Sequence, residues 1–291
     1  MLKREIGLII LIFFLNGCAP ARHNIRLIYI HGMDATAPKN ELKKQWDEAL
    51  FGTSSAIEKA HTRMAYWGRS KSAVSLAMNE PIKRMQDEFA VRLKQSLKDN
   101  IARNNRYQEH ALPTQLFYQE CALPTQSLLD ERLLELFSKD LDAFFFDESE
   151  HKRMCAVLKH EMVDARNSDE GIIIIAYSLG SVIAFDVLSQ SSIDVKLLIT
   201  IGSPLGVPLI QYWYKERYGV SALTAPRHVA RWVNIANKYD IIAYDGNLSD
   251  KFLPKGFVQD KKCCFSGRNL HSAEKYLSKS ELRNEFNSAW K

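Results

Sequence analysis

The feature that most limits how this chain can fold is the run GIIIIAYSLGSVIAF at residues 171–185. Residues 171–177 show no alternation of polar and apolar side chains, so we expect a β-strand buried on both faces. Such strands occur in parallel sheets that carry helices on either side. The following residues, 181–188, have an amphipathic helical pattern. The run therefore predicts a strand that turns directly into a helix at Ser178.

Other apolar runs have the length and composition of strands in the same sheet, and they alternate with helical patterns. This alternation predicts an α/β fold with a mostly parallel sheet flanked by helices. The further predicted strands are residues 25–32, 62–68, 195–206, 229–236 and 256–265.

A stretch of about a hundred residues before the central strand has helical rather than strand-like periodicity. Apolar residues recur every three or four positions over 82–101 and again over 127–141. No linker rich in Pro, Gly or Ser divides the chain. We therefore expect one domain over residues 18–291, with a helical cap inserted at about 72–150.

The first twenty residues, MLKREIGLIILIFFLNGCAP, combine a basic start with a short apolar segment. This segment is too short for a stable transmembrane span and is typical of a signal peptide, here residues 1–17. Residues 15–18, LNGC, resemble the lipobox of bacterial lipoproteins, in which Cys18 becomes the lipidated first residue. Ala19 then predicts anchoring in the outer membrane facing the periplasm. The alternative is a plain signal peptide in which Cys18 has no role.

Export would place the remaining cysteines in an oxidising compartment. They are Cys121, Cys155, Cys263 and Cys264. A disulfide from the 263/264 pair to Cys121 or Cys155 is one possibility, and free buried thiols are the other. We do not expect a metal site, because no CxxC or HxxxH spacing accompanies the cysteines. No dinucleotide fingerprint occurs either, so no cofactor is predicted.

The charge of the chain gives little support for nucleic-acid binding. The formal net charge is +5 over 291 residues, and no run rich in Lys and Arg stands out. We therefore expect no nucleic-acid partner.

Ser178 has the surroundings of a catalytic nucleophile. The sequence AYSLG at 176–180 fits a nucleophile elbow in which the first glycine is replaced by Ala176. This turn exposes the serine hydroxyl at the carboxyl edge of the sheet, and the helix that follows directs its positive end towards it. A serine hydroxyl needs a neighbouring base to become a nucleophile. In folds that carry a nucleophile elbow, an acid and then a histidine follow the serine along the chain, so we expect both partners after Ser178.

Two acids and one histidine are the best placed of these partners. Asp240 lies five residues after the apolar run that ends at residue 235, where a loop at the carboxyl edge would hold it. Asp245 is the alternative acid. His271 lies in a loop after the last predicted strand, whereas His228 precedes a strand and so lies at the opposite edge. We expect His271 to be the base.

Two backbone N–H groups are needed to stabilise the negative charge that develops during acyl transfer. Leu179 follows the nucleophile directly and would supply one. The loop after the first strand, HGMDAT at 31–36, would supply the other, from Met33. In this interpretation His31 shapes the loop and takes no part in the chemistry.

These segments together resemble the α/β-hydrolase superfamily, specifically its lipases and serine esterases. The matching segments, in the family's order, are IYIHGM, IAYSLGSVIAFDVL, TIGSPLG, WVNIANKYDII and NLHSAEKYL. The chain lacks the first two strands of the full-length family sheet. It has Tyr177 where His is common before the serine. It has Ile241 where Pro is frequent after the acid, which leaves Asp245 open as the acid.

The resemblance implies a membrane-anchored serine hydrolase that cleaves carboxylic esters through an acyl-enzyme. Ser178, Asp240 and His271 would form the triad, with Met33 and Leu179 as oxyanion donors. Lipid or fatty-acyl esters are the substrates suggested by a lipid anchor at Cys18. The competing hypothesis is an inactive hydrolase-like lipoprotein that serves as a binding or scaffolding module.

Overall fold

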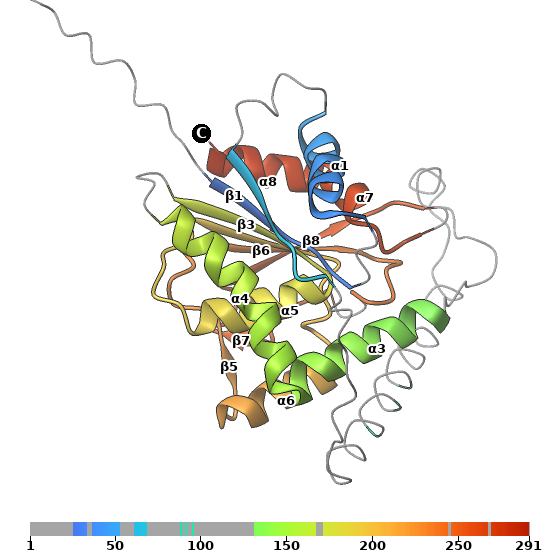
Figure 1. Cartoon of the computed structure of the whole chain (residues 1–291), viewed down its shortest axis with the longest axis vertical. Coiled ribbons are helices and arrows are strands. Elements are labelled where there is room, and N and C mark those ends of the chain that lie inside the picture. Colours follow the sequence, from blue (N-terminus) through green and yellow to red (C-terminus); the bar gives the residue numbers. More distant parts are fainter. Residues whose placement is uncertain are drawn as a thin grey trace, which may run out of the picture.

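A six-stranded parallel sheet forms the centre of the molecule (Figure 1). The computed structural model describes residues 26–33, 37–52, 61–68, 131–166, 171–243, 246–266 and 269–290, together with Glu88, Val91 and Gln95. The strands are β1 (Arg26–Ile30), β2 (His61–Ala65), β3 (Ile172–Tyr177), β4 (Leu197–Ile201), β6 (Trp232–Asn237) and β8 (Val258–Cys263). Their order is β2-β1-β3-β4-β6-β8, and every neighbouring pair is parallel.

The prediction of an α/β fold with a parallel sheet is confirmed. Each of the six strands falls on one of the predicted runs, to within a few residues. A separate two-stranded sheet of β5 (Leu223–Thr224) and β7 (Phe252–Leu253) was not predicted. Two residues are too few for a strand pattern to be read from the sequence.

Helices cover both faces of the sheet (Figure 1). α1, α7 and α8 pack on one face, and α3, α4, α5 and α6 pack on the other. Their bounds are α1 (Lys39–Phe51), α3 (Glu131–Phe146), α4 (Glu148–Ala165), α5 (Leu179–Ser189), α6 (Pro208–Tyr218), α7 (Ala273–Leu277) and α8 (Ser280–Trp290).

The central strand β3 shows why its sequence contains no polar alternation. Ile172 and Ile174 pack into the core beneath α4 and α5. Ile173 and Ile175 point the other way, into the core beneath α1 and α7. Because successive side chains of a strand face opposite sides, a strand covered on both sides must be apolar at every position.

The helix α5 differs from its sequence prediction. Every residue from Leu179 to Leu188 is buried, so the helix is enclosed on all sides and has no solvated face. α6 contributes to this cover, since the Tyr214 hydroxyl donates a hydrogen bond to the carbonyl of Val182 at 2.6 Å and its ring contacts Phe185. Because a second layer of helices packs over α5, this helix does not have the solvated polar face that its amphipathic sequence pattern predicts.

Part of the predicted cap is described. Residues 131–150 form α3 and the start of α4, and Phe137, Leu141 and Phe144 of α3 are buried in the same core as α5. Apart from Glu88, Val91 and Gln95, the rest of the range 72–150 lies outside the described residues, as do the predicted signal peptide at 1–17 and Cys18. Among the described helices, none has the length and apolarity to span a bilayer.

A close approach of two backbones fixes the start of α5 against the end of β1. A Cβ atom on Gly180 would lie 2.5 Å from the carbonyl oxygen of His31 and 2.6 Å from that of Ile30. Both distances are far below a normal van der Waals contact, and both atoms belong to the backbone. Only glycine at position 180 lets the helix begin so close to the neighbouring strand.

We predict that Gly180→Ala destabilises the protein by about 1–3 kcal/mol, because the added methyl group forces α5 away from β1. Urea unfolding of the variant and the wild type measures the difference. Ser189→Ala is the matched control, since Ser189 is exposed at the end of the same helix and should change stability by less than about 0.5 kcal/mol. Equal stabilities of Gly180→Ala and Ser189→Ala would contradict the steric argument.

Candidate active site

Ser178 lies in a strained turn between β3 and α5. Its backbone has φ 52° and ψ −128°, a region that residues with a side chain rarely adopt. Hydrogen bonds hold this conformation from both sides. The Ser178 N–H donates to the carbonyl of Ile201 on β4 at 3.0 Å, and the Ser178 carbonyl accepts from the Ser181 hydroxyl at 2.6 Å. Strain of this kind persists where the surrounding structure over-determines it, and it is common at functional sites.

The structure brings Ser178, His271 and Asp240 into one chain of hydrogen bonds. His271 Nε2 lies 2.8 Å from Ser178 Oγ, and His271 Nδ1 lies 2.7 Å from Asp240 Oδ2. The three residues are buried, with exposed fractions of 0%, 7% and 2% for Ser178, His271 and Asp240 respectively. An imidazole placed in this way between a hydroxyl and a carboxylate can take the hydroxyl proton and be stabilised as it does so.

The parallel sheet explains how residues so far apart in sequence meet. Ser178 follows β3, Asp240 comes three residues after β6 ends, and His271 lies between β8 and α7. The carboxyl ends of parallel strands share one edge of the sheet, where ligands of open α/β sheets bind. The loop of His271 is fixed to this edge by Asn237, whose side-chain amide donates to the carbonyls of Phe265 and Leu270.

Asp240 is held by four donors. Its Oδ2 accepts the Tyr276 hydroxyl at 2.7 Å as well as His271, and its Oδ1 accepts the N–H groups of Ile242 at 3.0 Å and Ala243 at 3.4 Å. Burial, and then the charge of Asp240, raise the pKa of Tyr276 well above its ordinary value. This hydroxyl therefore stays protonated and donates a hydrogen bond to the carboxylate. The carboxylate therefore has a fixed orientation towards His271.

Tyr177 and Gly202 enclose the imidazole. The rings of Tyr177 and His271 lie 4.8 Å apart with an interplanar angle of 30°. Burial, and then the charge of Asp240, raise the pKa of Tyr177, so the ring facing His271 is neutral. Gly202 has φ 57°, and a Cβ there would lie 3.1 Å from atoms of Asp240, His271 and Tyr276. A larger residue at position 202 would displace the histidine.

Several carboxylates that follow Ser178 have other partners. Asp260 accepts hydrogen bonds from the N–H groups of Leu248 and Ser249 and from the side-chain amide of Asn234, so it organises a loop.

His228 lies at the amino-terminal side of the sheet, as expected. It is half-exposed and its Nδ1 lies 2.8 Å from Asp194 Oδ1. Asp245 lies outside the described residues, so the structure does not compare it with Asp240.

The two predicted oxyanion donors belong to segments that adjoin Ser178. Leu179 is the first residue of α5, and the first N–H groups of a helix lack partners within the helix. On the other side, a Cβ on Gly32 would lie 2.7 Å from Ser178 Cβ, so the loop after β1 touches the serine. Met33 is the next residue of that loop and packs against the core beneath α5.

His31 is a buried residue that shapes this loop. Its Nε2 accepts the backbone N–H of Trp67 at 3.0 Å, so its proton is on Nδ1, which lies 2.6 Å from the carbonyl of Gly32. The indole N–H of Trp67 donates to the His31 carbonyl at 3.1 Å, and the two rings are stacked. The position agrees with the loop-shaping role expected from the sequence, whereas the contact with Trp67 was not foreseen.

The described cysteines divide into two kinds. Cys155 and Cys263 are free and buried. Cys264 is disulfide-bonded, and its bonding partner lies outside the described residues. A disulfide to Cys155 is therefore excluded, and Cys263 takes no part in one.

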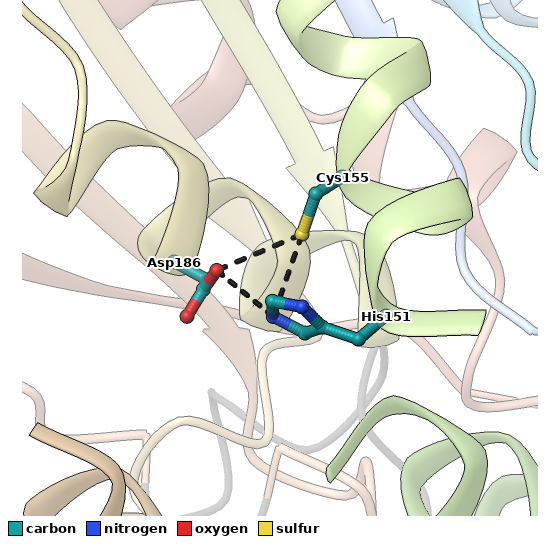
Figure 2. A group of neighbouring side chains, drawn as sticks. All are labelled: His151, Cys155 and Asp186. Atoms are coloured by element: carbon teal, nitrogen blue, oxygen red, sulfur yellow. Dashed lines mark hydrogen bonds and ion pairs between the residues drawn. The ribbon is translucent and has the colours of Figure 1, made fainter. Parts of the chain in front are cut away.

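A second polar cluster was missed in the sequence. His151 and Cys155 of α4 meet Asp186 of α5, with ligand-type atoms of all three close together (Figure 2). The sequence signal was the HxxxC spacing at 151–155, which places both side chains on one face of a helix.

No protein-family model matches the chain, and no curated protein matches it.

We predict that the stability of the protein falls in acid through His31. Burial lowers the pKa of His31 from 6.5 to about 4, so the unfolded chain binds this proton well before the folded protein does. The contribution of neutral His31 is therefore complete above pH 6.5 and declines by about 3 kcal/mol as the pH falls to 4. A His31→Gln variant lacks this titration. Urea unfolding at pH 7 and pH 4 measures the difference in free energy of unfolding between the wild type and this variant. We expect the difference to shift by about 3 kcal/mol against the wild type at pH 4. The same difference at both pH values would contradict the prediction.

Proposed function

We propose that this protein is a serine hydrolase of the α/β-hydrolase superfamily that cleaves carboxylic esters through an acyl-enzyme intermediate. The observation that carries the proposal is the hydrogen-bonded chain Ser178–His271–Asp240, which begins at a serine in a strained strand-to-helix turn. The combination matters because a hydroxyl becomes a nucleophile only when a fixed base can take its proton.

In the proposed reaction, Ser178 Oγ attacks the ester carbonyl while its proton moves to His271 Nε2. The tetrahedral intermediate collapses, the bond to the alcohol breaks, and His271 returns the proton to the leaving alcohol. Water then attacks the acyl-enzyme in the same way, giving the carboxylic acid and restoring Ser178. Asp240 keeps His271 oriented through Nδ1 and stabilises the imidazolium.

The N–H groups of Met33 and Leu179 are the proposed oxyanion hole. The loop of Met33 touches Ser178 at Gly32, and Leu179 follows the nucleophile directly at the positive end of α5. Preorganised donors aimed at the developing charge can supply about 3–4 kcal/mol each in transition-state stabilisation. The closeness of α5 to β1 at Gly180 supports this role, because it fixes the two donors relative to each other.

The proposed substrates are lipid or fatty-acyl esters. This part of the proposal rests on the predicted signal peptide at 1–17 and on lipidation of Cys18, which would hold the protein at the outer membrane on the periplasmic side. Two or more acyl chains give stable membrane attachment. Ser178 is fully buried, so an ester reaches its Oγ only when neighbouring groups move aside.

The second candidate function is a binding or scaffolding module without catalysis, which would not hydrolyse any ester. An inactive relative would have no use for the strained serine or for the four donors that orient Asp240. This is why we favour the enzyme.

We predict that full-length protein in detergent hydrolyses p-nitrophenyl esters and that Ser178→Ala lowers kcat by about 10⁶-fold, or to the assay background. Hydrolysis measured over a series of acyl-chain lengths would then define the chain preference. Far-UV circular dichroism checks that the variant is folded. Activity retained by folded Ser178→Ala would overturn the proposed nucleophile, and a wild type without turnover on any ester would favour the binding module.

The acid can be tested separately with a matched pair of variants. Asp240→Asn should lower kcat by about 10⁴-fold, because an amide cannot stabilise the imidazolium and favours the wrong tautomer of His271. Asp245→Asn makes the same chemical change five positions later and should stay within a few-fold of wild type. The reverse ranking would assign the acid role to Asp245.

A further inference from the structure

The cluster of His151, Cys155 and Asp186 lies away from the proposed active site. Asp186 is on α5 eight residues beyond Ser178, which corresponds to about 12 Å along the helix. The other two residues are one turn apart on α4. Nothing in the proposed hydrolase mechanism uses these side chains.

Their three ligand-type atoms converge on one point (Figure 2). His151 Nε2 lies 3.1 Å from Asp186 Oδ2, and Cys155 Sγ lies 3.7 Å from His151 Nε2 and 3.6 Å from Asp186 Oδ2. A tetrahedral zinc ion with bonds of about 2.0 Å to N and O and 2.3 Å to S separates its ligand atoms by roughly 3.3–3.6 Å. The observed triangle is therefore close to one face of such a tetrahedron.

The electrostatics of the cluster also suit a cation. Asp186 is fully buried. Its carboxylate accepts hydrogen bonds from His151 and Tyr218, and the buried Cys155 thiol lies 3.6 Å from its Oδ2. The guanidinium of Arg217, which lies over Phe144 and Phe145 and donates to their carbonyls, partly balances the charge of Asp186.

The surroundings hold the carboxylate in position. The Tyr218 hydroxyl donates to Asp186 Oδ1 at 2.7 Å, and the Gln190 side-chain amide donates to Oδ2 at 3.0 Å. Partners of this kind orient the ligands of metal sites. Phe144 packs against the His151 ring at 4.8 Å, while the His151 side chain stays 15% exposed to solvent.

We propose that His151, Cys155 and Asp186 form a zinc-binding site that joins α4 to α5. The ligand set of imidazole, thiolate and carboxylate suits this borderline-soft ion. On binding, the metal replaces the thiol proton of Cys155, which leaves to solvent. The Nε2 proton that His151 donates to Asp186 moves to Nδ1 by exchange with solvent, so that neutral His151 binds the metal through Nε2. The charge of Zn²⁺ is then balanced by the Cys155 thiolate and the Asp186 carboxylate. A water molecule is the fourth ligand. The site is independent of the proposed hydrolase activity.

The first test uses Co²⁺ as the spectroscopic probe on full-length protein freed of metal with a chelator. We expect one Co²⁺ per chain, a thiolate-to-cobalt charge-transfer band in the near ultraviolet, and loss of that band when Zn²⁺ displaces the cobalt. Cys155→Ser should lose the band, because the thiolate is gone. The matched control is Cys263→Ser, which removes the second free buried thiol of the described residues and should keep the band.

Two results would overturn the site: a wild type that gives no thiolate band at saturating Co²⁺, or a band that survives in Cys155→Ser. If Cys155→Ser does not fold, Tyr218→Phe decides, since it keeps all three ligands and removes one hydrogen bond to Asp186. It should weaken Zn²⁺ binding by about 10- to 100-fold with the cobalt band intact, and an unchanged affinity would contradict the proposal.

Discussion

The whole arrangement depends on the contact between the start of α5 and the end of β1. Gly180 and Gly32 have no side chains, so the backbone of the helix and the loop after β1 can close around Ser178. The serine is forced into a positive φ at the same point. A bulkier residue at either glycine would separate the two segments, and with them the hydroxyl and the proposed oxyanion donors. The energy that holds this turn comes from the packing around it, because β3 is buried from Ile172 to Ala176 and α5 from Leu179 to Leu188.

The second requirement is that the histidine loop and the acid loop stay in register with the serine. Asn237 at the end of β6 links the two, since its side chain binds the carbonyl of Leu270 and its N–H donates to the Tyr276 hydroxyl. Tyr276 in turn donates to Asp240. The edge of the sheet, the loop before α7 and the carboxylate are thus one hydrogen-bonded unit. Its buried donors and acceptors are costly to leave unpaired, which favours a single arrangement.

Much of this could be predicted from the sequence, and the reasons are physical. β3 was recognisable because a strand buried on both faces must be apolar at every position. Ser178 and His271 could be placed together because both follow predicted strands of one parallel sheet, whose carboxyl ends meet. Asp240 could not be separated from Asp245 by this reasoning, since both follow the same strand. The hydrogen bond from Tyr276 was invisible, because it depends on how α7 packs rather than on any local pattern.

Other features escaped because they depend on contacts between distant helices. α5 was expected to have a polar face, but α4 and α6 cover it. The cluster of His151, Cys155 and Asp186 joins residues 31 to 35 positions apart on separate helices, so no short motif contains all three. Within the sequence the cluster appears as a histidine and a cysteine one helical turn apart, which differs from the CxxC and HxxxH spacings of familiar zinc sites. Asp186 meets them only because α5 packs against α4, and sequence periodicity does not show that packing.

The most direct measurement of the proposed chemistry is covalent labelling of the full-length protein with a fluorophosphonate, in detergent micelles that supply a lipid-like surface, followed by peptide mass spectrometry. Such a reagent modifies a serine whose hydroxyl is activated by a neighbouring base. Modification at Ser178 that is lost in folded His271→Ala is the result expected of a serine hydrolase. Folded wild-type protein that remains unmodified at Ser178 in micelles would contradict it.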